Sequence, residues 1–153
     1  MTLQDQTTFR ERRAPNDIVR RARDVLGTPF QHQGRQPRVG LDCLGLVVHS
    51  IGQEAEAVDQ RDYASVPDSI RLEAALSRYF DRVDVDDPSD APDGSVLAFC
   101  VFGDPRRSVR HLGIKSDRGM IHARHGARNA VVEIAIGSAW RDLFLGAYQW
   151  RAQ

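Results

Sequence analysis

The sequence predicts an α+β domain in which N-terminal helices pack on a central antiparallel β-sheet. Apolar residues recur at helical spacing in three segments before residue 81. From Ser95 onward the pattern changes to short continuous apolar runs, which are typical of buried strands. The turn-forming run DVDDPSDAPDG separates the two halves. Helices followed by strands are typical of the α+β class.

The first helix is expected to begin with Asn16 or Asp17 as its N-cap and to end at Gly27. Pro29 prevents its continuation. The apolar face of this helix consists of Ile18, Val19, Ala22, Val25 and Leu26. Residues 31–40 contain two glycines and one proline, and they are expected to form an irregular loop.

The second helix is expected to follow Asp42, a good N-cap, and to run through CLGLVVHSI to Gly52. The polar and acidic residues 53–67 form a connection to a third helix, which Asp68 caps and which ends near Phe80. The apolar side of the third helix consists of Ile70, Ala74, Leu76, Tyr79 and Phe80.

The C-terminal half predicts strands and one short helix. SVLAFCVF is expected to be a buried strand, and RHLGIK and GMIHA two further strands that the turn 116–119 joins. AVVEIAI predicts another strand, SAWRDLF a short helix capped by Ser138, and LGAYQW the last strand.

Composition limits the class of protein. The length of 153 residues suits one domain, residues 15–153, after a polar and flexible arm, residues 1–14. The net charge of zero argues against a nucleic-acid partner. No apolar run approaches about 18 residues, so we expect no membrane span, and the N-terminus has no apolar segment of a secretory signal. Two cysteines make no disulfide framework.

Cys43 is the strongest candidate for a catalytic residue. It occupies the first position of the helix that Asp42 caps, where free backbone N–H groups and the helix dipole favour a negative charge. A thiolate is stabilised there, so we expect the pKa of Cys43 to lie below its ordinary value. Gly45 leaves room for a substrate beside this turn. The alternative is a small buried apolar residue, which is how we interpret Cys100; nothing in the sequence requires a disulfide between the two.

A cysteine nucleophile needs an imidazole base and a third group that orients the imidazole. With a four-residue turn, His111 and His122 point to the same face of two paired strands. A three-residue loop places His125 on that face instead. Pairing with a thiolate raises the pKa of His111. A zinc site formed by these histidines and Cys43 is the alternative, although no HExxH or CxxC pattern supports it.

Three segments resemble the NlpC-type cell-wall cysteine peptidases, which have a papain-like fold. LGTPFQHQGRQPRVGLDCLGLV resembles the nucleophile region of that family, RHLGIKSDRGMIHA resembles its two histidine strands, and DGSVLAF stands where the family has Gly-Asp-Leu-Val-Phe-Phe. The likeness extends over about residues 16–136. It implies hydrolysis of amide bonds in peptidoglycan stem peptides, next to D-glutamate and diaminopimelate.

The resemblance implies that Cys43 is the nucleophile, His111 the base and His122 the orienting residue, and that no cofactor or metal takes part. The expected substrate-binding residues are Phe30, His32, Asp42, Gly45 and Arg110. Phe30 departs from the family, which has tyrosine there, and a phenolic hydroxyl is therefore missing. Arg110 belongs to one of several arginine-rich segments, which either meet substrate carboxylates or form solvated hairpin tips.

Three segments resemble a narrower branch of this family, the small peptidases encoded among the tail genes of phages and gene transfer agents. These segments are GTPFQHQG, DYASVPDSIRLEAALSRYF and AWRDLFLGAYQW. This implies a tail-tip component that is made in the bacterial cytoplasm and opens the host cell wall in the periplasm for DNA delivery. Its partners are then the stem peptide and tail-tip or hub proteins, and the missing signal fits delivery in a particle. An inactive tail-tip plug or adaptor and an acyltransferase stay open as alternatives.

Overall fold

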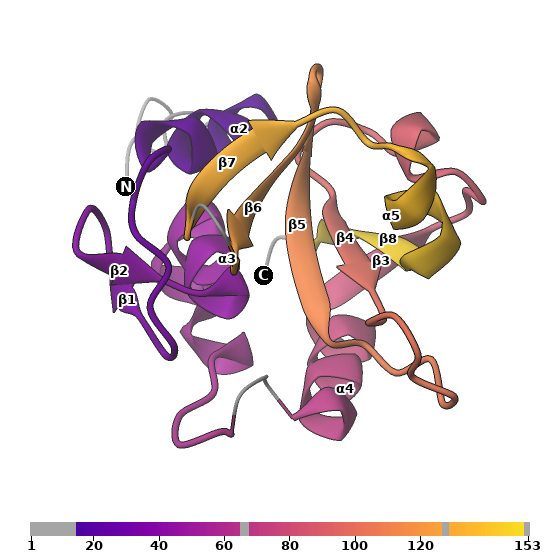
Figure 1. The fold of residues 1–153 in the computed structure, drawn as a ribbon, viewed down its shortest axis with the longest axis horizontal. Coiled ribbons are helices and arrows are strands. Elements are labelled where there is room, and N and C mark those ends of the chain that lie inside the picture. The colour runs from indigo at the N-terminus through magenta and orange to yellow at the C-terminus, as the bar shows by residue number, and fades with distance from the viewer. Residues whose placement is uncertain (1–14, 65–67, 127–128, 152–153) are drawn as a thin grey trace, which may run out of the picture.

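The computed structural model describes residues 15–64, 68–126 and 129–151 of the chain. Its centre is an antiparallel sheet (Figure 1). The order of its six strands is β3 (Phe80–Val83), β8 (Phe144–Trp150), β4 (Val96–Phe99), β5 (His111–Ser116), β6 (Gly119–Arg124) and β7 (Ala130–Ile134). In the described part of the chain three α-helices precede the sheet, so the predicted α+β class is confirmed. The arm predicted for residues 1–14 lies outside the described residues.

Two of the predicted helices have the predicted N-caps. Helix α3 (Cys43–Ile51) begins after Asp42, whose carboxylate accepts a hydrogen bond from the Gly45 N–H at 2.8 Å. Helix α4 (Ser69–Tyr79) begins after Asp68, whose carboxylate accepts one from the Arg71 N–H at 3.0 Å. The buried residues of α4 are Leu72 and Leu76, whereas Ile70 is 77% exposed, so the predicted apolar side of this helix is partly wrong.

Helix α2 (Pro15–Asp24) differs from its prediction at both ends. Asn16 and Asp17 lie inside the helix and not at its N-cap. Asp17 instead forms ion pairs with Arg20 and Arg21, one helical turn further on, which occupy its carboxylate. The helix ends before Gly27, which has a positive φ of 85° and turns the chain toward the following loop.

Several short elements escape prediction. The expected loop 31–40 contains one strand of a small hairpin, β1 (Arg35–Gln36), and the start of its partner β2 (Gly40–Leu41). Two 3-10 helices, η1 (Gln53–Val58) and η2 (Pro88–Asp90), interrupt the connections. Strand β3 lies at the edge of the sheet and has two exposed charged residues. Its sequence therefore does not differ from that of a connection between elements. Helix α5 (Ser138–Leu143) has Gly137 as its N-cap, so the predicted Ser138 cap is wrong.

The pairing of β5 with β6 has the register of the four-residue turn. Ser116 pairs with Gly119 and Ile114 with Ile121. Strand β4 is buried throughout, as its apolar run predicts. The run nevertheless leaves the sheet after Phe99, and Phe102 is 94% exposed.

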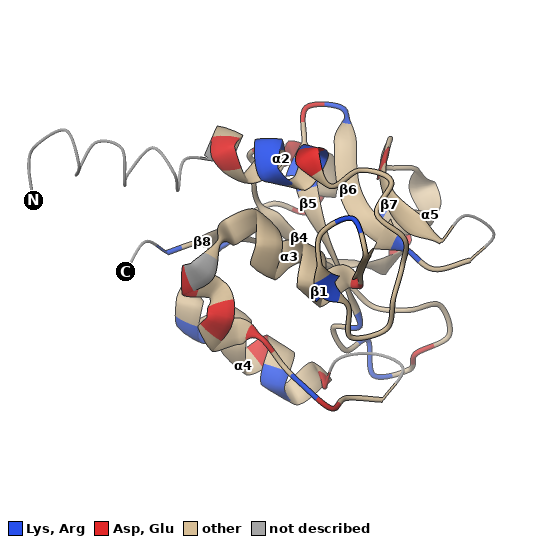
Figure 2. Cartoon of the chain, turned by 90° about the vertical axis from the view of Figure 1, so that its left-hand side faces the viewer, with Lys and Arg blue, Asp and Glu red and all other residues tan. Residues whose placement is uncertain are grey.

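The two faces of the sheet carry separate cores, because side chains alternate along each strand. One face packs against α2, α3 and α4 and includes Ala98, Leu112 and Ile121. The other includes Leu97, Phe99 and Met120, and residues of α5 cover it. Figure 2 shows acidic and basic residues mixed along α2 and α4. Among the described residues, no helix has the length and apolar character to cross a membrane.

Candidate active site

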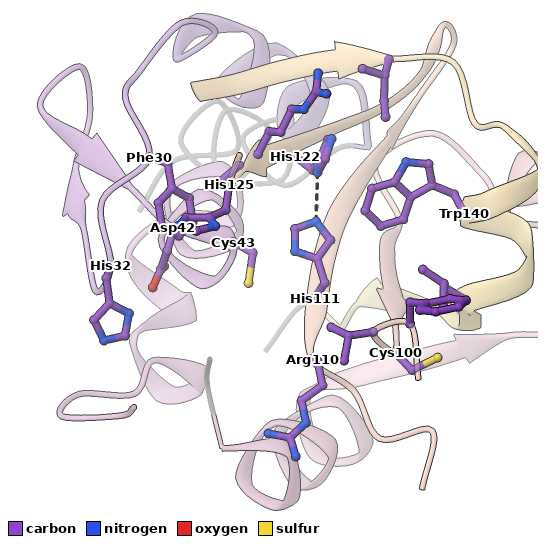
Figure 3. A pocket seen from close by; sticks show the side chains of 16 residues that line it. Phe30, His32, Asp42, Cys43, Cys100, Arg110, His111, His122, His125 and Trp140 are labelled. Carbon is purple, nitrogen blue, oxygen red and sulfur yellow. Dashed lines mark hydrogen bonds between the residues drawn. The ribbon is translucent and has the colours of Figure 1, made fainter. Parts of the chain in front are cut away.

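The nucleophile candidate Cys43 is the first residue of α3 and is 5% exposed. Its thiol faces the backbone N–H groups of Leu112 and of Leu44. Since Leu112 follows His111 directly in β5, the start of α3 lies against the start of this strand. Cys43 and His111 line the same pocket, as the sequence predicts for a nucleophile and its base (Figure 3).

Asp42 is held by the protein itself. Its carboxylate accepts hydrogen bonds from the backbone of Gly45 and Gln33, from the Arg35 guanidinium at 2.8 Å and from the Tyr63 hydroxyl. Both oxygens are therefore satisfied, and the residue is 3% exposed although it lines the pocket. Asp42 thus fixes the start of α3 and is not free to bind a substrate, which corrects the role predicted for it.

Gly45 also has a structural role in place of the predicted one. A Cβ atom at this position would lie 2.1 Å from the carbonyl oxygen of Gly34. The absence of a side chain therefore lets the loop before α3 approach the helix, and Gly45 does not line the pocket. The expectation that this glycine makes room for a substrate is wrong.

The two histidines meet across the β5–β6 pair. His111 Nε2 lies 2.9 Å from His122 Nδ1, and Figure 3 marks this hydrogen bond. His125 instead packs against Phe30, with ring centroids 4.8 Å apart and an interplanar angle of 69°. The prediction that His122 and not His125 lies within hydrogen-bond reach of His111 is confirmed, because the four-residue turn sets the register.

The far nitrogen of His122 has a different environment. His122 is 3% exposed, and its Nε2 atom is buried without a hydrogen-bond partner in the described part of the chain. If His111 accepts a proton at Nδ1, its Nε2–H donates to His122 Nδ1, and His122 then carries its own proton at Nε2. This tautomer leaves one buried N–H unpaired.

Trp140 of α5 packs against both histidines, which sequence reasoning did not anticipate. Its indole stacks on His111 with ring centroids 5.4 Å apart and an interplanar angle of 28°. It meets His122 edge-on at 5.1 Å and 77°. Phe99 supports the indole from the sheet at 5.0 Å. The apolar side chains of SAWRDLF indicate that this short helix packs against the sheet. No rule of residue spacing, however, predicts that it lies over His111.

The pocket has a volume of about 860 Å³. Besides Cys43 and the two histidines, its lining includes four of the predicted substrate-binding residues, Phe30, His32, Asp42 and Arg110. The His32 ring is held by a contact of its Nε2 with the Tyr63 carbonyl oxygen at 3.1 Å. The Arg110 guanidinium lies 3.9 Å from the Asp104 carboxylate. Arg124, which was not singled out by itself, also lines the pocket.

Burial dominates the protonation of the site. It raises the pKa of the Cys43 thiol to about 12, and the negative charge of Asp42 acts in the same direction. Burial lowers the pKa of His111 to about 3, assisted by His122, and lowers the pKa of His122 to about 4, assisted by Arg124. The predicted thiolate–imidazolium pair is therefore wrong for this state, since burial, together with the charge of Asp42, outweighs what the helix N-terminus offers. Thiol and imidazoles are neutral at pH 7.

The described residues contain no group of three or more His, Cys, Asp or Glu side chains arranged to hold a metal ion. Cys43 and Cys100 are both free and buried.

Comparison with known proteins rests on structure, because no protein-family model and no curated protein sequence matches the chain. An NlpC/P60 family protein from Bacillus cereus superposes over 90% of the chain with a TM-score of 0.62 and 23% identity. A protein of the same family from Staphylococcus aureus superposes over 91% with a TM-score of 0.57 and 19% identity. The chain has the NlpC/P60 fold. It spans 40% and 42% of the length of these two proteins.

Isolated NlpC/P60 domains match over nearly their whole length. The domain of the peptidoglycan hydrolase SagA is 25% identical, with 88% of this chain and 97% of that domain aligned and a TM-score of 0.52. RipD from Mycobacterium tuberculosis is 14% identical, with 88% and 95% aligned and the same TM-score. RipD is described as a non-catalytic NlpC/P60 domain protein adapted to peptidoglycan binding. The NlpC/P60 fold therefore occurs both with and without catalysis.

Proposed function

We propose that this chain is a peptidoglycan hydrolase that uses Cys43 to cleave amide bonds of stem peptides. The observation that carries the proposal is the meeting of Cys43, His111 and His122 in one pocket. A nucleophile, a base and a group that orients the base are the parts that acyl transfer through a thiol requires. SagA, a peptidoglycan hydrolase with the same fold, supports the choice of substrate.

The neutral state of the pair implies general-base catalysis. The Cys43 thiol gives its proton to His111 Nδ1 while the sulfur attacks the amide carbon, and the His111 Nε2–H donates to His122. The backbone N–H of Cys43 at the start of α3 stabilises the oxyanion of the tetrahedral intermediate. His111 then returns the proton to the departing amine as the C–N bond breaks. Water finally hydrolyses the thioester with His111 again as the base.

The polar part of the pocket fits an anionic substrate. Arg110 and Arg124 both line the pocket, and His32 adds a third nitrogen group. Stem peptides carry carboxylates, for which guanidinium groups are suited donors. Among the pocket residues Asp42 is the one acidic side chain, and its carboxylate is fully occupied by donors of the protein.

Substitution of the nucleophile tests the proposal. Purified chain is incubated with peptidoglycan, and released fragments are identified by mass spectrometry. We expect Cys43→Ala to lower the rate by about 10³-fold or more, since loss of a nucleophile removes the covalent route. Cys100→Ala, which removes the other buried thiol, should keep the activity. Cleavage by Cys43→Ala within about tenfold of the unmodified chain contradicts the proposal.

A second candidate is peptidoglycan binding without catalysis. The observation that favours it is the neutral, buried state of Cys43 and His111, which leaves no preformed thiolate. RipD is an example of such an adaptation in this fold. Co-sedimentation with insoluble peptidoglycan distinguishes the candidates: binding by both the unmodified chain and Cys43→Ala, without released fragments from either, supports this second function.

We also propose that the chain acts as a tail-tip component of a phage or gene transfer agent, opening the cell wall for DNA delivery in the periplasm. Its support is the resemblance of GTPFQHQG and AWRDLFLGAYQW to the tail-associated branch. Mass spectrometry of purified particles tests it. Presence of the chain in particles together with tail-tip or hub proteins is expected, and its presence only in the cytosol or free in the medium contradicts it.

A further inference from the structure

A buried tyrosine outside the pocket is bonded to the residue that precedes Cys43. Tyr63 lies in the connection between η1 and α4 and is 8% exposed. Its hydroxyl donates a hydrogen bond to Asp42 Oδ2 and accepts one from the Arg35 guanidinium at 2.8 Å. Because Tyr63 does not line the pocket, any influence of its hydroxyl on Cys43 passes through Asp42.

The Arg35 guanidinium is shared between two carboxylates. Its Nη1 donates to Asp42 Oδ1 at 2.8 Å, and its Nε donates to Asp59 Oδ1 at 2.8 Å. One positive charge therefore faces two negative charges, and these three side chains together keep one negative charge. The Tyr63 hydroxyl supplies a further donor, to the second oxygen of Asp42. Burial and the bond to Asp42 raise the pKa of Tyr63, so its hydroxyl keeps its proton.

The charge of Asp42 acts on the sulfur of Cys43. Burial raises the pKa of Cys43 most, the charge of Asp42 raises it further, and the charge of Arg35 lowers it. A donor on a carboxylate oxygen stabilises the negative charge of that group and weakens its effect on a neighbouring thiolate. This effect is strongest away from water, where Tyr63 and Asp42 lie.

We propose that Tyr63 is a positioning residue for Cys43, because its hydroxyl holds the Asp42 carboxylate in place and screens the charge of that group from the sulfur. The inference rests on the proposed function, in which this sulfur is the nucleophile, and adds a residue that controls its reactivity. The rest of Tyr63 has a separate role. Its carbonyl oxygen contacts His32 Nε2 at 3.1 Å, and the two ring centroids lie 5.3 Å apart. Tyr63→Phe removes the hydroxyl and keeps these contacts.

Alkylation by iodoacetamide at pH 9 measures the reactivity of the sulfur without a substrate. The sulfur forms a bond to the CH₂ carbon, the C–I bond breaks, and iodide and the thiol proton leave. Peptide mass spectrometry separates Cys43 from Cys100, whose rate should not change. We expect Tyr63→Phe to lower the rate at Cys43 by about 3- to 10-fold, since loss of a hydrogen bond to a charged group lets the charge of Asp42 oppose the thiolate more strongly.

The direction of the change separates this role from a merely structural one. Cys43 is 5% exposed, so a variant that only loosened the packing would admit the reagent and increase the rate. The matched control is Tyr148→Phe, which also removes a hydroxyl beside an arginine. Tyr148 Oη lies 3.5 Å from the Arg82 guanidinium, and Tyr148 is outside the pocket. This variant should keep the rate.

The charge of Asp42 is tested by Asp42→Asn. Asparagine is also a good N-cap, so α3 should still begin at Cys43. Without a carboxylate there is no charge to screen, and adding Tyr63→Phe to this variant should change the rate by no more than about twofold. The same fall as in the Asp42 background would mean that the hydroxyl does not act through that charge.

The outcomes separate the role of Tyr63 from the hydrolase function. An unchanged or higher rate at Cys43 in Tyr63→Phe overturns the inference, and so does an equal fall in Tyr148→Phe or in the Asp42→Asn background. If these rates contradict the inference while the unmodified chain cleaves peptidoglycan, the proposed function remains intact. If the rates are as expected and no fragments are released, the proposed function fails and the effect of Tyr63 on the thiol remains.

Discussion

Two opposing influences act on the sulfur of Cys43. The start of α3 offers backbone N–H groups, among them that of Leu44, and these favour a thiolate. Burial and the adjacent carboxylate of Asp42 favour the neutral thiol, and together they outweigh the N–H groups. Cys43 therefore rests in its protonated form, and under the proposed function it must be activated when a substrate binds.

The alkylation rate of Cys43 by iodoacetamide should follow this raised pKa. Because only the thiolate reacts, the rate should increase about tenfold per pH unit from pH 7 to pH 10 without a plateau, as the pKa is about 12. Glutathione, measured in parallel, should level off near its own ordinary thiol pKa. A plateau for Cys43 below pH 8 contradicts the expectation and restores the thiolate–imidazolium pair.

Trp140 should act as a positioning residue for the histidine pair. Its indole limits the rotation of His111 and shields the bond between His111 and His122 from water. We expect Trp140→Ala to lower kcat by about 10- to 100-fold with a smaller change in KM, and Trp140→Phe to lose less. The NMR resonance of the hydrogen-bonded imidazole N–H should be lost in Trp140→Ala and kept in Trp140→Phe.

The control for Trp140 is Trp150→Phe. Trp150 packs against Tyr79 and Phe80 on the other core, and its ring contacts involve neither histidine. This variant should keep the imidazole resonance and the activity. An unchanged resonance and kcat in Trp140→Ala would show that the stacking has no catalytic consequence.

Individual residues could be predicted from the sequence where a local rule applies. The capping preference of aspartate predicts that Asp42 and Cys43 lie at the start of a helix. The four-residue turn predicts that His111 and His122 lie on the same face of two paired strands. Trp140 could not be predicted, because its position depends on how α5 folds back over the sheet. The protonation of Cys43 also escaped prediction, since burial is a property of the folded molecule.

Helix α3 is held in place by a close approach between backbones. Gly45 lies where a Cβ atom would come within 2.1 Å of the Gly34 carbonyl oxygen. A backbone atom cannot move aside as the end of a flexible side chain can. The position of Cys43 thus depends on a glycine that does not line the pocket.

Substitution of Gly45 by alanine should push α3 away from the loop that contains Gly34. We expect Gly45→Ala to lower the free energy of unfolding by about 2 kcal/mol or more, and to lower the activity as Cys43 shifts. The matched control is Gly137→Ala, where a Cβ atom would meet nothing within 4 Å and where φ is −85°. Thermal denaturation should distinguish the two, and equal melting temperatures would contradict this account of Gly45.

Elements with strong periodicity or clear caps could be predicted, as α3, α4 and the buried strand β4 show. The short edge strand β3 could not, because it is identified by its pairing with β8, far away in the sequence. Helix α2 was predicted with the wrong start, since Asp17 is as suitable for ion pairs within a helix as for a cap. Capping rules alone do not separate these two uses of an aspartate.

The molecule as a whole should be sensitive to acid. His111 and His122 are buried and neutral, with pKa values lowered to about 3 and about 4. Between the ordinary histidine value and these values the unfolded chain binds protons that the folded chain does not, so stability falls as the pH falls. Each such histidine removes about 1.4 kcal/mol per pH unit in this window.

Chemical denaturation between pH 6.5 and pH 4.5 measures this sensitivity. The unmodified chain should lose stability steadily over this range, and His122→Gln should show a smaller loss because one of the two titrating groups is gone. His125→Gln, which removes an exposed ring, should keep the slope of the unmodified chain. Identical slopes in all three chains would mean that His122 binds as many protons in the folded chain as in the unfolded chain.

Strand β8 is the last of the six strands in the sequence, yet it lies between β3 and β4. While the polypeptide emerges from the ribosome, β3 and β4 therefore each have an unpaired edge until β8 has been synthesised, because β8 is the strand that pairs with these edges. Open edges are templates for pairing with other chains, so the nascent protein is exposed to aggregation until residues 144–150 have been added. A premature stop codon before residue 144 should thus yield insoluble protein and not a soluble, less stable domain.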